Sequence, residues 1–179
     1  MLILALSLPV GVVSAQSGTS SQAQSRTRDI AASFTKFKNV SKTKRGITKA
    51  KYLKVESEPV VKSNPADYSG VYQVPGMDFA LDLSVDRNGV VTGSGYEVLS
   101  GSVKRTFTLR DGRVEGALLT ATKVYAGGGT QNIEGAFMNR TSFESPTDKG
   151  QTVFGFGARI TPVELDGNTF DRLFFDKVR

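Results

Sequence analysis

The stretch Phe79-Ala-Leu-Asp-Leu-Ser-Val-Asp-Arg-Asn-Gly-Val-Val-Thr-Gly-Ser-Gly-Tyr96 decides the fold of this chain. In its first half, bulky apolar residues stand at every second position from 79 to 85. A period of two predicts a strand with one buried side. A turn follows at 86–89, where Asn88 and Gly89 tolerate positive φ. The residues from 90 to 96 return with the same period, so the stretch predicts a β-hairpin.

The rest of the chain beyond residue 67 repeats this hairpin pattern. Short segments rich in Gly, Pro, Asn and Asp separate the apolar alternations, and Asp111-Gly112 is the strongest two-residue hairpin signal. We expect eight strands, at 69–74, 79–86, 89–99, 103–111, 113–125, 130–143, 151–161 and 170–178. Eight short strands in a meander favour an all-β, antiparallel up-and-down barrel at 67–179, because closure removes exposed sheet edges.

The composition argues against catalysis. The 179 residues include no Cys, His or Trp, so thiolate nucleophiles, disulfides and the commonest general base and metal ligand are all missing. Carboxylate pairs such as Asp82 with Asp86 alternate with the apolar face, so they should point to solvent, where their pKa values are weakly tuned. We therefore predict a protein that is not an enzyme and that holds no metal or cofactor.

The first fifteen residues have the character of an export signal. Residues 1–15 carry no charged side chain, are mostly apolar and end in Val13-Ser14-Ala15. Small residues at these positions are typical of a signal-peptidase site, with cleavage before Gln16. The alternative is a buried apolar strand or helix. The signal peptide predicts a secreted or periplasmic protein.

Residues 16–66 form a basic leader of different composition. They contain eleven Lys or Arg against three acidic residues, whereas 67–179 contain twelve against fourteen. We expect a disordered linker, with a possible short helix near 29–37, where Ile30 and Phe34 share a face. The lysines could form an arm that weakly contacts an anionic surface, or they could belong to a solvated linker. Specific nucleic-acid binding is not expected.

The start of the predicted barrel carries a short motif, Tyr68-Ser-Gly70-Val-Tyr72. This motif resembles the Gly-x-aromatic first strand of calycin-type barrels, the architecture of lipocalins and avidins. The usual Trp of that motif is Tyr72 here. The resemblance implies an up-and-down meander, and Arg172 corresponds loosely to the Arg that packs against the Trp in those barrels.

One internal pattern recurs in four of the predicted strands. In each, a β-branched residue is followed two positions later by a glycine, which places both on one face. We interpret this face as the barrel interior, where the glycines either allow the strands to bend and aromatic rings to pack, or leave room for a ligand. The glycines concerned are Gly93, Gly116, Gly135 and Gly155.

Three polar residues share the predicted inner face near strand ends. Arg105 follows Val103, and Asn139 and Arg159 continue the two strands that contain Gly135 and Gly155. They could line a cavity mouth and bind an anionic group. Alternatively, a β-bulge could shift the register and turn them to solvent.

These observations leave two hypotheses of different classes. In the first, the barrel is a non-enzymatic binding module that holds a small apolar or weakly anionic ligand. In the second, the barrel is solid and acts on an envelope or extracellular protein through its outer face or loops, as an interaction or inhibitor domain. Large side chains that fill the space over the interior glycines would favour the second.

Overall fold

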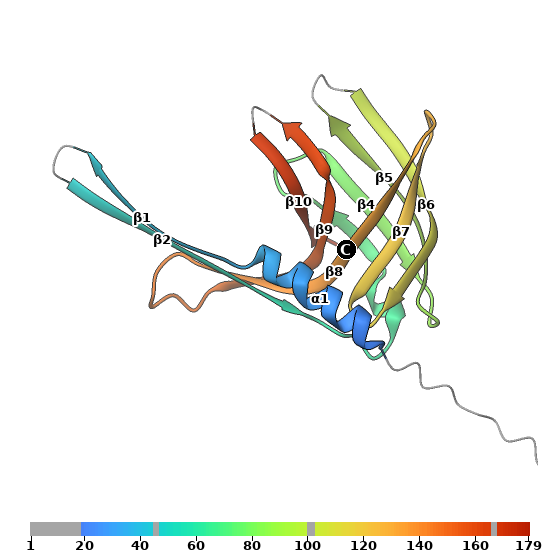
Figure 1. Ribbon diagram of the computed structural model, residues 1–179, viewed down its shortest axis with the longest axis horizontal. Coiled ribbons are helices and arrows are strands. Elements are labelled where there is room, and N and C mark those ends of the chain that lie inside the picture. Colours follow the sequence, from blue (N-terminus) through green and yellow to red (C-terminus); the bar gives the residue numbers. More distant parts are fainter. Residues whose placement is uncertain (1–18, 45–46, 100–102, 166–167) are drawn as a thin grey trace, which may run out of the picture.

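A closed barrel with a helix and a long hairpin on its outside makes up the protein (Figure 1). The computed structural model describes residues 19–44, 47–99, 103–165 and 168–179. The elements in chain order are α1 (Ser21–Phe34), β1 (Lys36–Lys44), β2 (Ile47–Pro59), the short 3-10 helix η1 (Pro65–Tyr68), β3 (Gly70–Gln73), β4 (Phe79–Val85), β5 (Val90–Leu99), β6 (Val103–Glu115), β7 (Leu118–Tyr125), β8 (Thr130–Phe143), β9 (Gln151–Leu165) and β10 (Asn168–Lys177).

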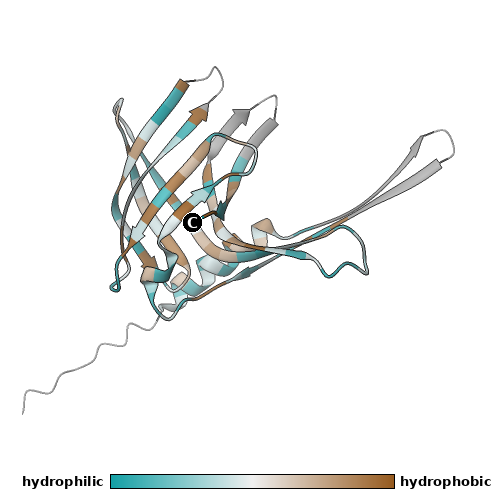
Figure 2. Cartoon of the chain, turned by 180° about the vertical axis from the view of Figure 1, so that it is seen from behind, coloured by the Kyte–Doolittle hydropathy of each residue, from teal (hydrophilic) through white to brown (hydrophobic). Residues whose placement is uncertain are grey.

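Strands β3 to β10 form the barrel. Each pairs antiparallel with its neighbour in the order β8-β7-β6-β5-β4-β3-β10-β9, and pairing of β8 with β9 closes the ring. The predicted eight-stranded up-and-down barrel is therefore confirmed. The alternation that predicted it is visible in Figure 2, where brown and teal segments follow one another along the barrel strands. The turn at 86–89 is present, with Gly89 at φ 78°.

One predicted turn is wrong, although the two strands that it was expected to join do pair. Asp111 and Gly112 do not form a turn but lie inside β6, where the register with β7 shifts between Arg110 and Arg113. Asp111 has a φ of 52°, a backbone conformation that occurs both in one class of bulge and in tight hairpin turns. The buried positions of β6 change from odd to even across this point, from Leu109 to Val114. An extra residue in one strand has this effect.

The strand β8 is long enough to pair with three other strands. Its first half pairs with β7, its second half pairs with β2, and β9 runs along its other edge. The exchange of partners occurs at Phe137, whose N–H donates to the Ala117 carbonyl (2.8 Å) and whose carbonyl accepts from Val60 N–H (3.0 Å). The hairpin of β1 and β2 is thus joined to the barrel by backbone hydrogen bonds.

Helix α1 begins earlier than the short helix expected near 29–37, and the strands β1 and β2 follow it in the segment that was expected to be a linker. It extends from Ser21 to Phe34, with the Ser20 hydroxyl accepting from Ala23 N–H at its start. Its apolar side packs on the outer wall of the barrel, so packing rather than intrinsic propensity orders the segment. The residues buried in this outer cluster are Ala23, Ile30, Ala31 and Phe34 of the helix and Leu118, Ala136, Met138 and Phe174 of the barrel.

Two polar contacts fix the helix on the wall. Arg26 forms an ion pair with Glu134 of β8, with 2.8 Å between the nearest N and O atoms. The Arg172 guanidinium donates to the Ser33 carbonyl at 2.6 Å. Arg172 therefore does not pack against Tyr72, as the calycin resemblance implied. Lys177 takes that place, with its Nζ 5.8 Å from the centroid of the Tyr72 ring.

The end of the barrel nearest η1 is plugged. Tyr68 of η1 is fully buried and its ring stacks on Phe137, with 4.1 Å between the ring centroids. Its hydroxyl accepts from Lys62 N–H and lies 2.8 Å from the Val60 carbonyl oxygen. The Tyr72 hydroxyl donates to the Tyr68 carbonyl, and burial raises the pKa of both tyrosines. This end is filled by aromatic rings whose hydroxyls have partners.

The leader is only partly covered by the structure. The predicted signal peptide at 1–15 lies outside the described residues. Within the described part of the chain, no helix is long and apolar enough to cross a membrane.

Candidate ligand-binding site

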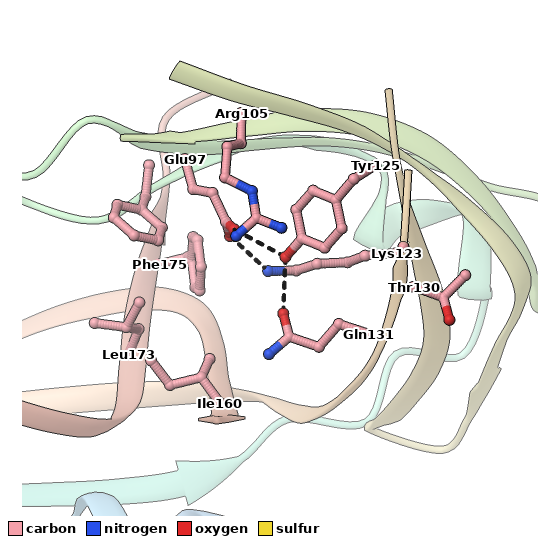
Figure 3. A pocket seen from close by; sticks show the side chains of 11 residues that line it. Glu97, Arg105, Lys123, Tyr125, Thr130, Gln131, Ile160, Leu173 and Phe175 are labelled. Carbon is pink, nitrogen blue, oxygen red and sulfur yellow. Dashed lines mark hydrogen bonds and ion pairs between the residues drawn. The ribbon is translucent and has the colours of Figure 1, made fainter. Parts of the chain in front are cut away.

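A cavity of about 350 Å³ opens at the end of the barrel opposite η1 (Figure 3). It is lined by residues of β4, β5, β6, β7, β8, β9 and β10 and of the connection from β7 to β8. The described residues that line it are Phe79, Glu97, Arg105, Lys123, Tyr125, Gly129, Thr130, Gln131, Ile160, Leu173 and Phe175.

Register and alternation place the charged side chains inside. Glu97 stands directly between Phe79 of β4 and Arg105 of β6 in the register of the sheet. On β7, Lys123 and Tyr125 continue the face of Ala121, which belongs to the barrel core. Because side chains two residues apart share a face, all of these groups meet at one level of the barrel.

A buried carboxylate is the centre of the cluster. Glu97 accepts a hydrogen bond from Lys123 Nζ at 3.0 Å on one oxygen and from the Tyr125 hydroxyl at 2.8 Å on the other. The side chains of Glu97 and Lys123 are each only 7% exposed. A buried charge is costly without a partner, so this carboxylate and this ammonium hold each other in place.

Tyr125 connects the charged pair to the rest of the wall. Burial raises the pKa of its hydroxyl, and the hydrogen bond to Glu97 raises that pKa further. The hydroxyl therefore stays protonated at neutral pH. Its oxygen also lies 2.8 Å from Oε1 of Gln131, as Figure 3 shows.

Arg105 is held differently from Lys123. Its guanidinium lies over the Tyr125 ring, 4.0 Å from the centroid, and its nearest nitrogen is 3.8 Å from Glu97 Oε1. The side chain is 41% exposed. Within the described part of the chain, Glu97 is the charged partner of the guanidinium, and their separation is longer than a hydrogen bond.

The opposite wall is apolar. Leu173 and Phe175 of β10 are buried, and Ile160 of β9 packs against the same core. Figure 3 shows these side chains facing the charged cluster across the cavity. Below them the barrel is filled, because a Cβ at Gly95 would approach the Phe107 ring to 2.5 Å.

The predicted site residues are scattered. Of the seven, all within the described residues, Arg105 alone lines this cavity. Arg159 lies on the outer face of β9, exposed and opposite Arg172 and Glu134 in the register. Asn139 is half-buried near the other end of β8, where β2 pairs with it. The structure therefore does not bring the three polar residues together.

The glycines divide in the same way. Gly93 and Gly135 lie on the inner face, beside core residues in the register, but a Cβ at Gly135 would collide with the Phe156 ring. Gly116 belongs to the turn between β6 and β7, with φ 62°. Gly155 faces outward, against Phe174 of the outer cluster. The predicted interior position is thus wrong for Gly116 and Gly155.

The sequence pattern contained a signal for the residues that were missed. Glu97 stands two residues beyond Gly95, and Lys123 stands two beyond Ala121, so strict alternation places both inside. Only the register across β5, β6 and β7 shows that they meet.

No known protein family, curated protein or solved structure matches this chain.

Proposed function

We propose that this protein is a non-enzymatic binding module that holds a small, largely apolar ligand at the open end of its barrel. The observation that carries the proposal is a cavity of about 350 Å³ with an apolar wall facing a fixed polar cluster. Ligand sites in proteins combine a mostly apolar lining with a few positioned polar groups, and their volumes begin near 300 Å³.

The binding test uses a neutral dye that fluoresces in apolar surroundings, N-phenyl-1-naphthylamine. We expect saturable binding to the wild-type protein. Ile160→Trp should abolish it, because a larger ring at this half-buried lining position fills the cavity. The matched control is Val90→Trp, a substitution at an exposed position beside the opposite end of the barrel. Absence of dye binding, or equal binding by both variants, would reject the proposal.

The rival function is a solid barrel that binds a protein partner. The filled middle of the barrel favours it, since Phe107 and Phe156 occupy the space over Gly95 and Gly135. Under this rival, the dye test fails while the protein still captures a partner through its outer surface. Mass spectrometry of the native protein, released from its source without denaturation, adds a direct check for a retained small molecule.

Export is the second part of the proposal. The apolar, uncharged residues 1–15 and the small residues before Gln16 support it. N-terminal sequencing of the native protein should begin at Gln16. A mature species that retains Met1 inside the cell would contradict export without affecting the cavity.

A further inference from the structure

The charges at the cavity are unequal. Its described lining contains two cations, Arg105 and Lys123, and one anion, Glu97. Lys123 Nζ and the Tyr125 hydroxyl already occupy one oxygen each of that carboxylate. Arg105 stands outside this arrangement, at a longer separation of 3.8 Å from Glu97. The lining therefore has one positive charge in excess, and that charge belongs to Arg105.

The Arg105 guanidinium is also prepared for a partner. Stacking on the Tyr125 ring restrains its plane, and Tyr125 is itself held by its hydrogen bond to Glu97. A guanidinium presents its N–H groups as a rigid fork that matches the two oxygens of a carboxylate. Because the fork is oriented before binding, less side-chain entropy is lost when an anion docks.

The apolar wall defines the other end of a ligand. Ile160, Leu173 and Phe175 lie across the cavity from the charged cluster. The Phe107 ring occupies the space over Gly95, so we expect the apolar body of the ligand to be short. A ligand that satisfies both walls has an anionic head and a short apolar body.

Resting on the proposed function, we infer that the ligand is a short amphipathic monoanion whose carboxylate binds Arg105. Its apolar body lies against Ile160, Leu173 and Phe175. Lys123 and Glu97 neutralise each other and position the Tyr125 ring under the guanidinium. A single negative charge balances the excess charge of the lining, whereas a phosphate monoester carries about 1.5 to 2 charges at neutral pH.

The test is displacement of bound N-phenyl-1-naphthylamine by eight-carbon probes that differ in the head group. Octanoate should displace the dye about ten- to a hundredfold more tightly than octanol, which corresponds to a charge-assisted hydrogen bond of about 1.5–3 kcal/mol. Octylamine should be the weakest probe, and octyl phosphate should bind less tightly than octanoate.

Variants locate the effect. Arg105→Gln should remove the advantage of octanoate over octanol while octanol itself still displaces the dye. Arg105→Lys should keep part of the advantage, because it retains the charge but lacks the fork. The matched control is Arg159→Gln, which removes the same charge from the outer face of β9 and should change nothing. Thermal unfolding of each variant verifies that it is folded.

The outcomes separate the two proposals. If the dye does not bind the wild-type protein, the proposed function fails. If the dye binds but octanoate displaces it no better than octanol, the cavity stands and the carboxylate inference is overturned. Tighter binding of octyl phosphate than of octanoate, or an unchanged octanoate advantage in Arg105→Gln, overturns it as well.

Discussion

The two ends of the barrel differ in side-chain chemistry, since one is packed with aromatic rings and the other contains charged groups. At the closed end, Tyr68, Tyr72 and Phe137 are fully buried and pack ring against ring. At the open end, a carboxylate and two cations form one wall of a cavity. The closed end contains the kind of packing that stabilises a fold. The open end contains charged groups, one pair of them buried, and these groups support the proposed binding of a ligand.

The difference teaches where substitutions should affect stability and where they should affect binding. Truncation of one ring in a packed aromatic cluster lowers the free energy of unfolding of the protein. A partly exposed charge contributes little to folding. The comparison therefore predicts a gradient, with the largest losses of stability at the closed end and the smallest at Arg105.

The largest effect should follow Phe137→Ala. Phe137 contacts Tyr68, Tyr72 and Phe156, and its backbone joins the turn before β7 to the segment that follows β2. Truncation of a buried Phe costs about 3–5 kcal/mol of the free energy of unfolding. Urea unfolding followed by circular dichroism measures this loss. The control is Val90→Ala at an exposed position. A loss below about 1 kcal/mol would show that the closed end is not the stabilising region.

The next effect concerns the buried pair at the open end. Glu97→Gln leaves the Lys123 ammonium, which is 7% exposed, without its counter-charge. Removing one member of a buried pair typically costs about 3–5 kcal/mol, and we expect a smaller loss here because the cavity admits water. Adding Lys123→Met to this variant should restore much of the stability. A double variant less stable than the single one would mean that Lys123 has another stabilising role.

A third substitution maps the boundary between the filled barrel and the cavity. Gly95→Ala would place a Cβ 2.5 Å from both the Ala80 carbonyl oxygen and the Phe107 ring. Overpacking of this kind typically costs about 1–3 kcal/mol. The matched control is Gly127→Ala, since no atom lies within 4 Å of a Cβ at that position. Equal stability of the two variants would indicate that both the Phe107 ring and the backbone of β4 at Ala80 can move away from the added methyl group.

Tyr125→Phe tests the hydrogen bond from the Tyr125 hydroxyl to the Glu97 carboxylate. Loss of one hydrogen bond to Glu97 should cost about 1–3 kcal/mol at neutral pH, since the acceptor is charged. The pKa of Tyr125 is raised in the folded protein, so its contribution is complete below the ordinary tyrosine pKa of about 10. That contribution is lost as the pH rises above this value, because the unfolded chain releases the proton more readily. As the pH rises from about 9 to about 11, the free energy of unfolding should therefore fall more for the wild-type protein than for Tyr125→Phe. Parallel pH profiles would contradict this assignment.

The sequence predicted the barrel because alternation and turn chemistry are local. The stretch from 79 to 96 folds as expected, with Asp86 accepting hydrogen bonds from Asn88 N–H and Val90 N–H at its turn. The turn predicted at Asp111-Gly112 was wrong because bulges and turns use the same residue types. The sequence did contain a sign of the bulge, since the apolar positions change from odd at Leu109 to even at Val114.

The site was less predictable because it depends on register between strands. Alternation placed Arg105 correctly, but on β9 it is the Phe156 face, and not the Gly155 face, that points inward. An outward glycine instead leaves room for helix α1 to pack on the wall, since a Cβ at Gly157 would approach Phe34 and Met138 to 2.7 Å. A helix that docks on the outer wall reverses the usual rule that polar residues mark the outside of a barrel strand.

The smallest effect on stability should be that of Arg105→Gln, and it decides how the binding data are read. The guanidinium is 41% exposed, its ion pair with Glu97 is long, and its contact with the Tyr125 ring is partly solvated. Exposed ion pairs and exposed cation–π contacts each contribute up to about 1 kcal/mol, so the free energy of unfolding should fall by less than about 2 kcal/mol. Urea unfolding measures it, with Arg159→Gln as the control. A loss above about 2 kcal/mol would place Arg105 among the groups that support the fold. A near-zero change, with loss of octanoate selectivity, would instead show a charge kept at the open end for binding alone.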